Sequence, residues 1–168
     1  EQFGSGMIFR AFEERALGLD NAMDGASIRF TPKKGIDLKA VMGKMRYRFD
    51  AGRVFNSEGI IRGIDGNISL NDIIPGFEDS EFKVSIGGSL VSRYQAAQND
   101  TIIIPKNVGA YGGRMNMRYK KFTLGLEYIH KDNDPTAQNG YAYNSGHGAL
   151  VNFGYSQKGL GIILIAKS

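Results

Sequence analysis

The sequence predicts an all-β fold, an antiparallel up-and-down transmembrane β-barrel. The first observation behind this prediction is a two-faced strand at residues 81–94. Its apolar residues alternate with polar ones, with Phe82, Val84, Ile86, Leu90 and Tyr94 on one side and Lys83, Ser85, Ser89 and Arg93 on the other. The same alternation returns at residues 109–119 and 122–128. Repeated strands of about ten residues with one apolar and one polar side are typical of barrels that face lipid.

Composition is the second observation. The 168 residues include 23 Gly, 8 Tyr and 10 Phe, with no Cys and only 4 Pro. This favours many strands and turns over a helical or disulfide-stapled fold. No segment approaches the roughly 18 consecutive apolar residues that a spanning helix needs. The mean hydropathy of −0.27 is compatible with a barrel, because barrel strands expose only alternate side chains to lipid.

Length and charge bound the organisation and the partners. We expect residues 1–168 to be part of a single β-barrel domain with no internal boundary, since barrels often exceed the usual domain length. The net charge is +4, but the basic residues are spread along the chain instead of gathering in one helix or run. We therefore expect no nucleic-acid partner.

Nine strands are predicted in order along the chain. They cover residues 5–15, 24–32, 36–49, 59–70, 81–94, 109–119, 122–131, 148–156 and 160–167. The last strand is nearly continuous in apolar residues (LGIILIA) and is followed by no terminal aromatic residue. Nine also conflicts with the even strand number of bacterial single-chain barrels. We therefore expect a fragment, about nine strands from the N-terminal half of a larger barrel.

The predicted links between strands alternate in length. Short polar or Gly-containing links at 32–35, 120–121 and 157–159 predict tight hairpin turns. Longer polar segments lie between them, at 16–23, 50–58, 95–108 and 131–147, and the link at 71–80 is of medium length. Such alternation is expected when short turns face the periplasm and long loops face outside.

Several segments also resemble a known family. Residues 9–18 (FRAFEERALG), then Asp20, Asn21 and residues 24–26, are similar to the opening of an uncharacterised family of Bacteroidota outer-membrane β-barrel proteins. Residues 111–131 and 141–167 share this likeness. The resemblance implies a location in the bacterial outer membrane and a barrel architecture. It implies no residue roles, because the family has no established activity.

The polar side of the strands supplies the main candidate site. If the Phe, Tyr and Met side chains meet lipid, a set of basic residues points into the lumen, with Glu14, Asp65 and Glu127 among the acids. The basic candidates are Arg10, Arg29, Lys44, Arg46, Arg48, Lys83, Arg93, Arg114 and Arg118. An excess of Arg in a pore favours anionic solutes. The alternative is that these residues pair with carboxylates across strands and fill the barrel.

Arg62 departs from this pattern because it shares a face with Ile60, Ile64 and Ile68. Two explanations are open. Either the Arg62 side chain reaches the membrane interface, or a bulge near Gly63 shifts the register.

A long loop supplies the second candidate site. His130 and His147 bracket a segment rich in Asp, Asn, Gly and Tyr. Within it, Asn139, Tyr141, Tyr143 and Asn144 are candidates for stacking on and hydrogen-bonding a sugar, while loop packing is the alternative role of such tyrosines. With no Cys and no close His spacing, we expect no metal site.

No catalytic motif is present, so we predict neither an enzyme nor a cofactor, although an outer-membrane hydrolase with a Ser/His pair is a further alternative. We expect a porin-like barrel that passes a small solute, anionic if the Arg set governs selectivity, or a barrel component of an envelope assembly. Its expected partners are the lipid bilayer with its lipopolysaccharide, the solute and an envelope protein. The alternative is a soluble lipocalin-like barrel whose apolar faces point inward around an apolar ligand.

Overall fold

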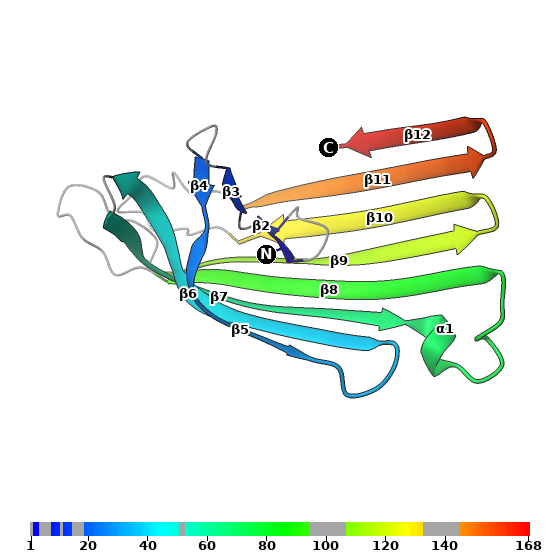
Figure 1. Cartoon of the computed structure of the whole chain (residues 1–168), viewed down its shortest axis with the longest axis horizontal. Coiled ribbons are helices and arrows are strands. Elements are labelled where there is room, and N and C mark those ends of the chain that lie inside the picture. Colours follow the sequence, from blue (N-terminus) through cyan, green and yellow to red (C-terminus); the bar gives the residue numbers. More distant parts are fainter. Residues whose placement is uncertain are drawn as a thin grey trace.

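A computed structural model describes residues 2–3, 8–10, 12–14, 19–50, 53–94, 107–132 and 145–168. Eight antiparallel strands form one up-and-down sheet in which each strand pairs with its neighbours in the chain (Figure 1). The strands are β5 (Met23–Phe30), β6 (Ile36–Asp50), β7 (Arg53–Ser69), β8 (Phe82–Tyr94), β9 (Asn107–Tyr119), β10 (Phe122–Lys131), β11 (Gly146–Gln157) and β12 (Leu160–Lys167). This confirms the predicted all-β, antiparallel up-and-down arrangement.

The sheet is open. Its two edges are β5 and β12, and these eight strands do not close into a barrel (Figure 1). The closed barrel expected from the sequence is therefore not present among the described strands. All eight residues of β12 are exposed, and residues 160–166 carry no polar side chain on either side of the strand. Ile163 and Ile165 point to one side, and Ile162 and Leu164 point to the other.

The prediction of a first strand at residues 5–15 was wrong. The described residues there form short strands, β1 (Gln2–Phe3), β2 (Phe9–Arg10) and β3 (Phe12–Glu14), which with β4 (Leu19–Asn21) make two separate two-stranded sheets. The apolar alternation in this segment is brief, so it supports only short pairings.

The prediction of a long loop at residues 50–58 was also wrong. Asp50 of β6 pairs with Arg53 of β7, so both strands continue far into the segment assigned to the loop. These strand ends contain polar residues that are also common in loops, so the sequence did not predict their pairing. The register shifts between Lys44 and Arg48, which interrupts the strict alternation on β6.

The predicted tight turns at 32–35, 120–121 and 157–159 are confirmed. They lie with the β7–β8 link at one end of the sheet (Figure 1). Gly35 and Gly159 have φ angles of 87° and 81°, which glycine adopts without steric cost, while Lys120 accepts a φ of 50° in its turn. We call this end of the sheet the turn end.

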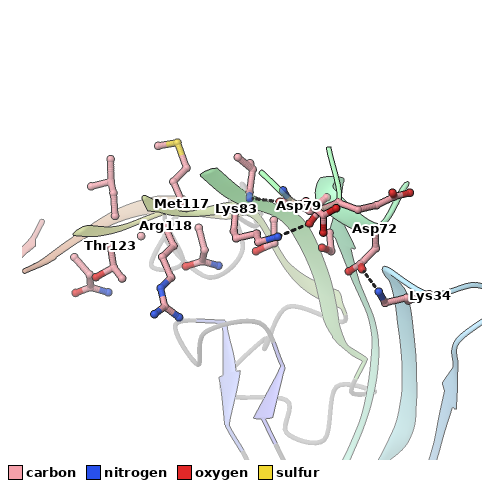
Figure 2. A pocket seen from close by; sticks show the side chains of 16 residues that line it. Lys34, Asp72, Asp79, Lys83, Met117, Arg118 and Thr123 are labelled. Atoms are coloured by element: carbon pink, nitrogen blue, oxygen red, sulfur yellow. Dashed lines mark hydrogen bonds and ion pairs between the residues drawn. The ribbon is translucent and has the colours of Figure 1, made fainter. Parts of the chain in front are cut away.

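The two faces of the sheet have opposite character. The face that carries Ile28, Ile64 and Leu90 is apolar, and these side chains are 70%, 62% and 52% exposed. On the opposite face Asp65, Ser89 and Glu127 are buried, together with Val41 and Ile61. Figure 2 shows Arg118 pointing into the hollow of the curved sheet and Met117 pointing away from it. The sheet therefore curves around its polar face.

Within the described residues, the single helix is α1 (Leu70–Ile73), and no helix there is long and apolar enough to cross a membrane. This short helix opens the β7–β8 link, the connection of medium length in the sequence. The side chain of Asn71, 4% exposed, holds the link together. Its Nδ2 donates to the carbonyl oxygens of Phe77 and Phe82, both at 2.9 Å, and its Oδ1 accepts from the Val84 N–H at 2.8 Å.

Replacing Asn71 by Ala should destabilise the fold by about 1–3 kcal/mol, because two partly buried carbonyls and one N–H would lose the buried amide that bonds them. Urea unfolding of the protein, followed by circular dichroism, measures this. Asp79→Ala is the matched control, since Asp79 is exposed in the same link and its side chain makes no hydrogen bond to another described residue. Equal stability of the two variants would contradict the assigned role of Asn71.

Candidate functional site

The polar face is the candidate functional surface. Every second residue of each strand lies on this face. The strand register aligns these residues in rows that cross the sheet between β5 and β12. Examples of such cross-strand rows are Lys39, Asp65, Ser89 and Gly112, and the row of Lys83, Arg118, Thr123 and Gly154. Side chains from distant parts of the sequence are therefore neighbours here.

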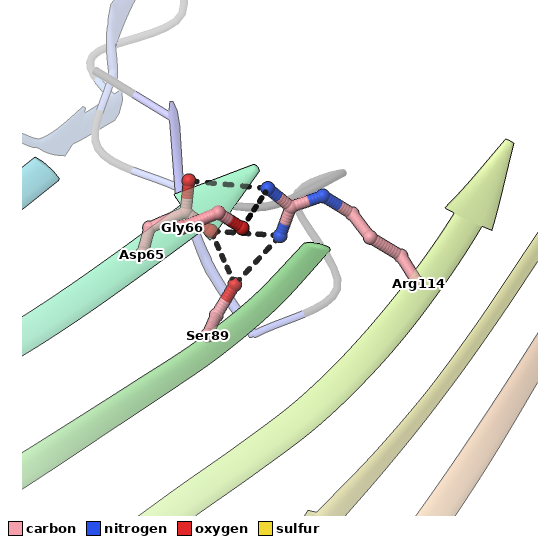
Figure 3. Close-up of polar contacts among 4 residues, drawn as sticks. All are labelled: Asp65, Gly66, Ser89 and Arg114. Carbon is pink, nitrogen blue, oxygen red and sulfur yellow. Dashed lines mark hydrogen bonds and ion pairs between the residues drawn. The ribbon is translucent and has the colours of Figure 1, made fainter. Parts of the chain in front are cut away.

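Asp65, Ser89, Arg114 and Glu127 form a group near the middle of this face, which we call the mid-sheet cluster. Arg114 Nη1 donates to Asp65 Oδ1 at 2.7 Å and to Ser89 Oγ at 2.9 Å (Figure 3). Arg114 Nη2 donates to Asp65 Oδ2 at 3.2 Å and to the Gly66 carbonyl at 3.2 Å. Ser89 Oγ in turn donates to Asp65 Oδ1 at 2.6 Å. The side chains of Arg114 and Asp65 are only 11% and 6% exposed, so this ion pair is largely shielded from water.

Gly87 makes this contact possible. Arg114 is on β9 and Asp65 on β7, so the guanidinium must cross β8, where the residue opposite Arg114 is Gly87. A Cβ atom at Gly87 would lie 2.6 Å from Arg114 Cζ, closer than real Cβ atoms approach. The missing side chain on β8 thus provides the space that Arg114 fills. Figure 3 shows Arg114 extending from its own strand toward Asp65 and Ser89.

Glu127 lies opposite Arg114 on β10. It is 8% exposed, and its Oε2 has no hydrogen-bond partner within the described part of the chain. The mid-sheet cluster therefore contains two acids around one Arg, whose hydrogen bonds go to Asp65, Ser89 and the Gly66 carbonyl.

A hollow of about 730 Å³ opens on the polar face at the turn end, and we call it the turn-end basin (Figure 2). It lies between the strands β8 to β11 and the β7–β8 link. Its lining includes Lys34, Asn71, Asp72, Glu78, Asp79, Lys83, Ser85, Asn116, Arg118, Thr123, Gly125 and Asn152. The arrangement offers amide, hydroxyl, cationic and carboxylate groups to a polar molecule, and hydrogen bonding and ion pairing are the chemistry it supports.

One ion pair and one hydrogen bond from an ammonium shape the rim of the basin. Lys34 Nζ lies 2.8 Å from Asp72 Oδ1, and Lys83 Nζ donates to the Glu78 carbonyl at 2.5 Å. The hydrogen bond to Lys34 lowers the pKa of Asp72, and the same bond raises the pKa of Lys34. A lowered carboxyl pKa means that this contact persists at neutral pH and is lost as the pH falls through the lowered value.

Five of the predicted basic candidates, Arg29, Lys83, Arg93, Arg114 and Arg118, lie on the polar face as expected. Arg29 is paired, with Nε and Nη2 donating to the two Asp37 carboxylate oxygens at 2.6 and 2.9 Å. Arg93 and Arg118 have no ion-pair partner among the described residues. Among the predicted basic candidates, Arg29 and Arg114 are thus paired with carboxylates, whereas Arg93 and Arg118 are not paired with any described carboxylate.

The prediction that Lys44 points into the lumen, on the polar face, was wrong. Its register partners are Asp24 and Ile60, which belong to the apolar side, so Lys44 lies on that side as well. The register shift that follows Lys44 on β6 explains the error, because simple alternation carried back from Arg46 gives the wrong side.

Arg62 remains on the apolar side, paired in register with Met42 and Ser92, and exposed. No register shift occurs at Gly63, so the explanation by a bulge there was wrong.

Other candidates lie outside the described residues. Asn139, Tyr141, Tyr143 and Asn144 are among them, as are the side chains of Arg10, Glu14, Arg46 and Arg48. Ser89, Asn71 and the Lys34–Asp72 pair were missed in the sequence, since single polar residues in strands and turns give no signal of their partners. In the described ranges, no three His, Cys, Asp or Glu residues come close enough together to bind a metal ion.

The chain belongs to a family described as a family of unknown function (DUF6029), whose model matches residues 1–168. No curated protein and no solved structure matches the chain. The family carries no statement of organism or location, so the resemblance to Bacteroidota outer-membrane barrels stays a prediction.

Gly87→Ala should destabilise the sheet by about 1–3 kcal/mol, because the new methyl group would displace the Arg114 guanidinium from Asp65. Gly88→Ala is the matched control, since a Cβ there meets only the Gly112 carbonyl at 3.5 Å, an ordinary contact. Denaturant unfolding of both variants measures the difference. Equal midpoints for the two would show that the space above Gly87 is not required.

Proposed function

We propose that this chain forms part of the wall of a bacterial outer-membrane β-barrel, with its apolar face toward lipid and its polar face lining a lumen that a small polar solute passes. One observation carries the proposal: an exposed apolar face extends across all eight strands while the opposite face buries charged side chains. A water-soluble sheet with one buried face has the reverse distribution.

The extent of the apolar face supports a lipid environment. Large exposed apolar side chains occur on β5, β6, β7, β8, β9, β10, β11 and β12, with Ile28, Met42, Ile64, Leu90, Tyr111, Tyr128, Val151 and Leu164 as examples. Soluble monomers rarely expose contiguous apolar patches larger than a few hundred Å². A hydrocarbon phase is the environment in which such a face is stable without a protein partner.

Aromatic residues gather at both ends of this face. At the turn end, Phe82, Tyr119, Phe122 and Tyr155 are aligned by register, and the Phe122 and Tyr155 rings are 4.9 Å apart. Toward the other end, the ring centroids of Tyr111 and His130 are 5.3 Å apart, and those of Tyr128 and His147 are 6.4 Å apart. Membrane barrels carry such aromatic girdles at the two interfaces.

The spacing of these aromatic residues suits an outer membrane. Tyr111 and Tyr119 are eight positions apart on β9. At about 3.4 Å per residue and a strand tilt of about 40°, they bound a band about 20 Å tall. The apolar band of outer-membrane barrels is about 25 Å tall.

A barrel wall in lipid cannot keep open edges, because unpaired backbone groups are too costly there. The proposal therefore requires β5 and β12 to be paired, either with each other or with further strands. Lipid and lipopolysaccharide would contact the outside of the closed barrel, and an envelope protein is a further partner that the proposal accommodates.

The soluble lipocalin-like alternative receives less support. In such a barrel the apolar side chains line the enclosed interior. Here the sheet curves around the polar face, where Asp65, Ser89 and Glu127 are buried, and Ile28 and Ile64 point to the open side.

The first experiment is the folding of the full-length protein with and without detergent. We expect β-rich circular dichroism and heat-modifiable migration on gels only in detergent or lipid. A β-rich monomer that folds in buffer alone and shows no gel shift would overturn the membrane proposal and make binding of an apolar ligand the leading function.

A single substitution tests which face meets lipid. Ile28→Arg should destabilise the protein in lipid vesicles, because a cation on a lipid-facing strand costs about 2–4 kcal/mol at the bilayer midplane and about 0–1 kcal/mol near the interfaces. Ser27→Arg is the matched control, because Ser27 is the neighbouring exposed residue of β5 and points to the polar face. Unfolding from vesicles by guanidinium measures both variants. In water two exposed positions would respond alike, so equal stabilities would contradict lipid contact at Ile28.

A further inference from the structure

We infer that the turn-end basin is a binding site for a small oxyanion, a carboxylate or phosphate group, held between Lys83 and Arg118. The inference rests on the proposed function, in which this basin belongs to the lumen, and it names the class of solute that the lumen takes.

The central observation is a pair of like charges. Lys83 on β8 and Arg118 on β9 are directly opposite in register and both lie on the polar face. Side chains directly opposite in an antiparallel pair have Cβ atoms about 5 Å apart, and like charges at such positions destabilise the sheet. An anion between the two cations removes this repulsion.

The acids of the basin are not in direct contact with the pair, although Asp72, which is bonded to Lys34, also interacts electrostatically with Lys83. Within the described part of the chain, neither Lys83 nor Arg118 forms an ion pair with a carboxylate. The Lys83 ammonium donates to the Glu78 carbonyl, which leaves donors free because an ammonium has three. Arg29 and Arg114 on the same face and Lys34 in the basin do have carboxylate partners, so Lys83 and Arg118 stand apart from them.

Neutral hydrogen-bonding groups surround the two cations. Thr123 lies opposite Arg118 on β10, and Asn116 and Asn152 lie on either side of Gly125. A Cβ atom at Gly125 would lie 3.1 Å from Asn116 Oδ1 and 3.6 Å from Asn152 Cβ, so the absence of a side chain there leaves room for both amides. Amide and hydroxyl donors beside two cations suit the several oxygen atoms of one oxyanion.

The acids of the basin limit the size of the ligand. Asp72 is already bonded to Lys34, whereas Glu78 and Asp79 are exposed on the β7–β8 link. Figure 2 shows Asp72 and Asp79 on the side of the link and Arg118 on the strands. A ligand with one anionic group directed to the strands therefore fits the basin. The carboxylates of the link would repel the further charges of an extended polyanion.

The test measures binding and permeation with named probes. Inorganic phosphate and acetate are titrated calorimetrically against the detergent-folded full-length protein, and reversal potentials are recorded in bilayers with a potassium acetate gradient. We expect Lys83→Gln and Arg118→Gln each to weaken phosphate binding about tenfold, the loss of one charge-assisted contact, and to lower the anion-to-cation permeability ratio.

Arg93→Gln is the matched control, since Arg93 lies on the same face of β8 near its other end and has no ion-pair partner in the described ranges. We expect it to leave phosphate binding unchanged. Lys83→Arg should retain binding, which separates loss of charge from loss of the Glu78 contact.

Two results would overturn the inference: unchanged phosphate binding in both Gln variants, or an equal loss in Arg93→Gln, which would indicate a diffuse effect of net charge. A protein that folds and binds phosphate through Lys83 and Arg118 but forms no conducting pore would retain the site and reject the transport role. Failure to fold in detergent, with folding in buffer, would reject the proposed function, and calorimetry in buffer would then still decide the binding site.

Discussion

The ion pair between Asp65 and Arg114 ties three strands together, and the separation of the two faces depends on the register that it requires. Arg114 reaches Asp65 only across Gly87, and Ser89 joins both of them. A one-residue slip of β8 would replace Gly87 by a residue of the other face and turn Ser89 toward the apolar side. A register that keeps the cluster therefore also keeps the apolar face, whereas a two-residue slip would keep both faces and lose the cluster.

Strict alternation made most of the sheet predictable. The run of Phe82, Val84 and Ile86 against Lys83 and Ser85 has only one extended solution in which each side is uniform. Alternation was misleading where the register shifts, as after Lys44 on β6. Contacts that join distant residues, such as Asn71 with Val84, leave no periodic trace, so sequence reasoning could not find them. Whether the sheet closes could not be found from periodicity either, because closure depends on pairings at the edges of β5 and β12.

The polar face separates two uses of charge. In the mid-sheet cluster the guanidinium is shielded and its donors are directed to one carboxylate, an arrangement that fixes geometry and leaves little charge for a solute. At the turn end, Lys83 and Arg118 remain in contact with water and lack carboxylate partners among the described residues. The sequence shows the same residue types in both places. Only the register, which brings Asp65 to one Arg and Lys83 to the other, distinguishes a structural cation from one that is available for binding.

The strand β12 has a consequence for how the chain must be handled before its fold is complete. Residues Leu160–Lys167 are exposed along their whole length, are apolar on both sides, and form an edge of the sheet. Segments of six or seven residues with high β-propensity, little charge and no Pro stack readily into cross-β assemblies when an edge is open. Until its outer edge is paired, β12 is thus the part of the described sheet most prone to self-association. Productive folding then depends on how quickly a correct neighbour, or a carrier that covers such edges, reaches it.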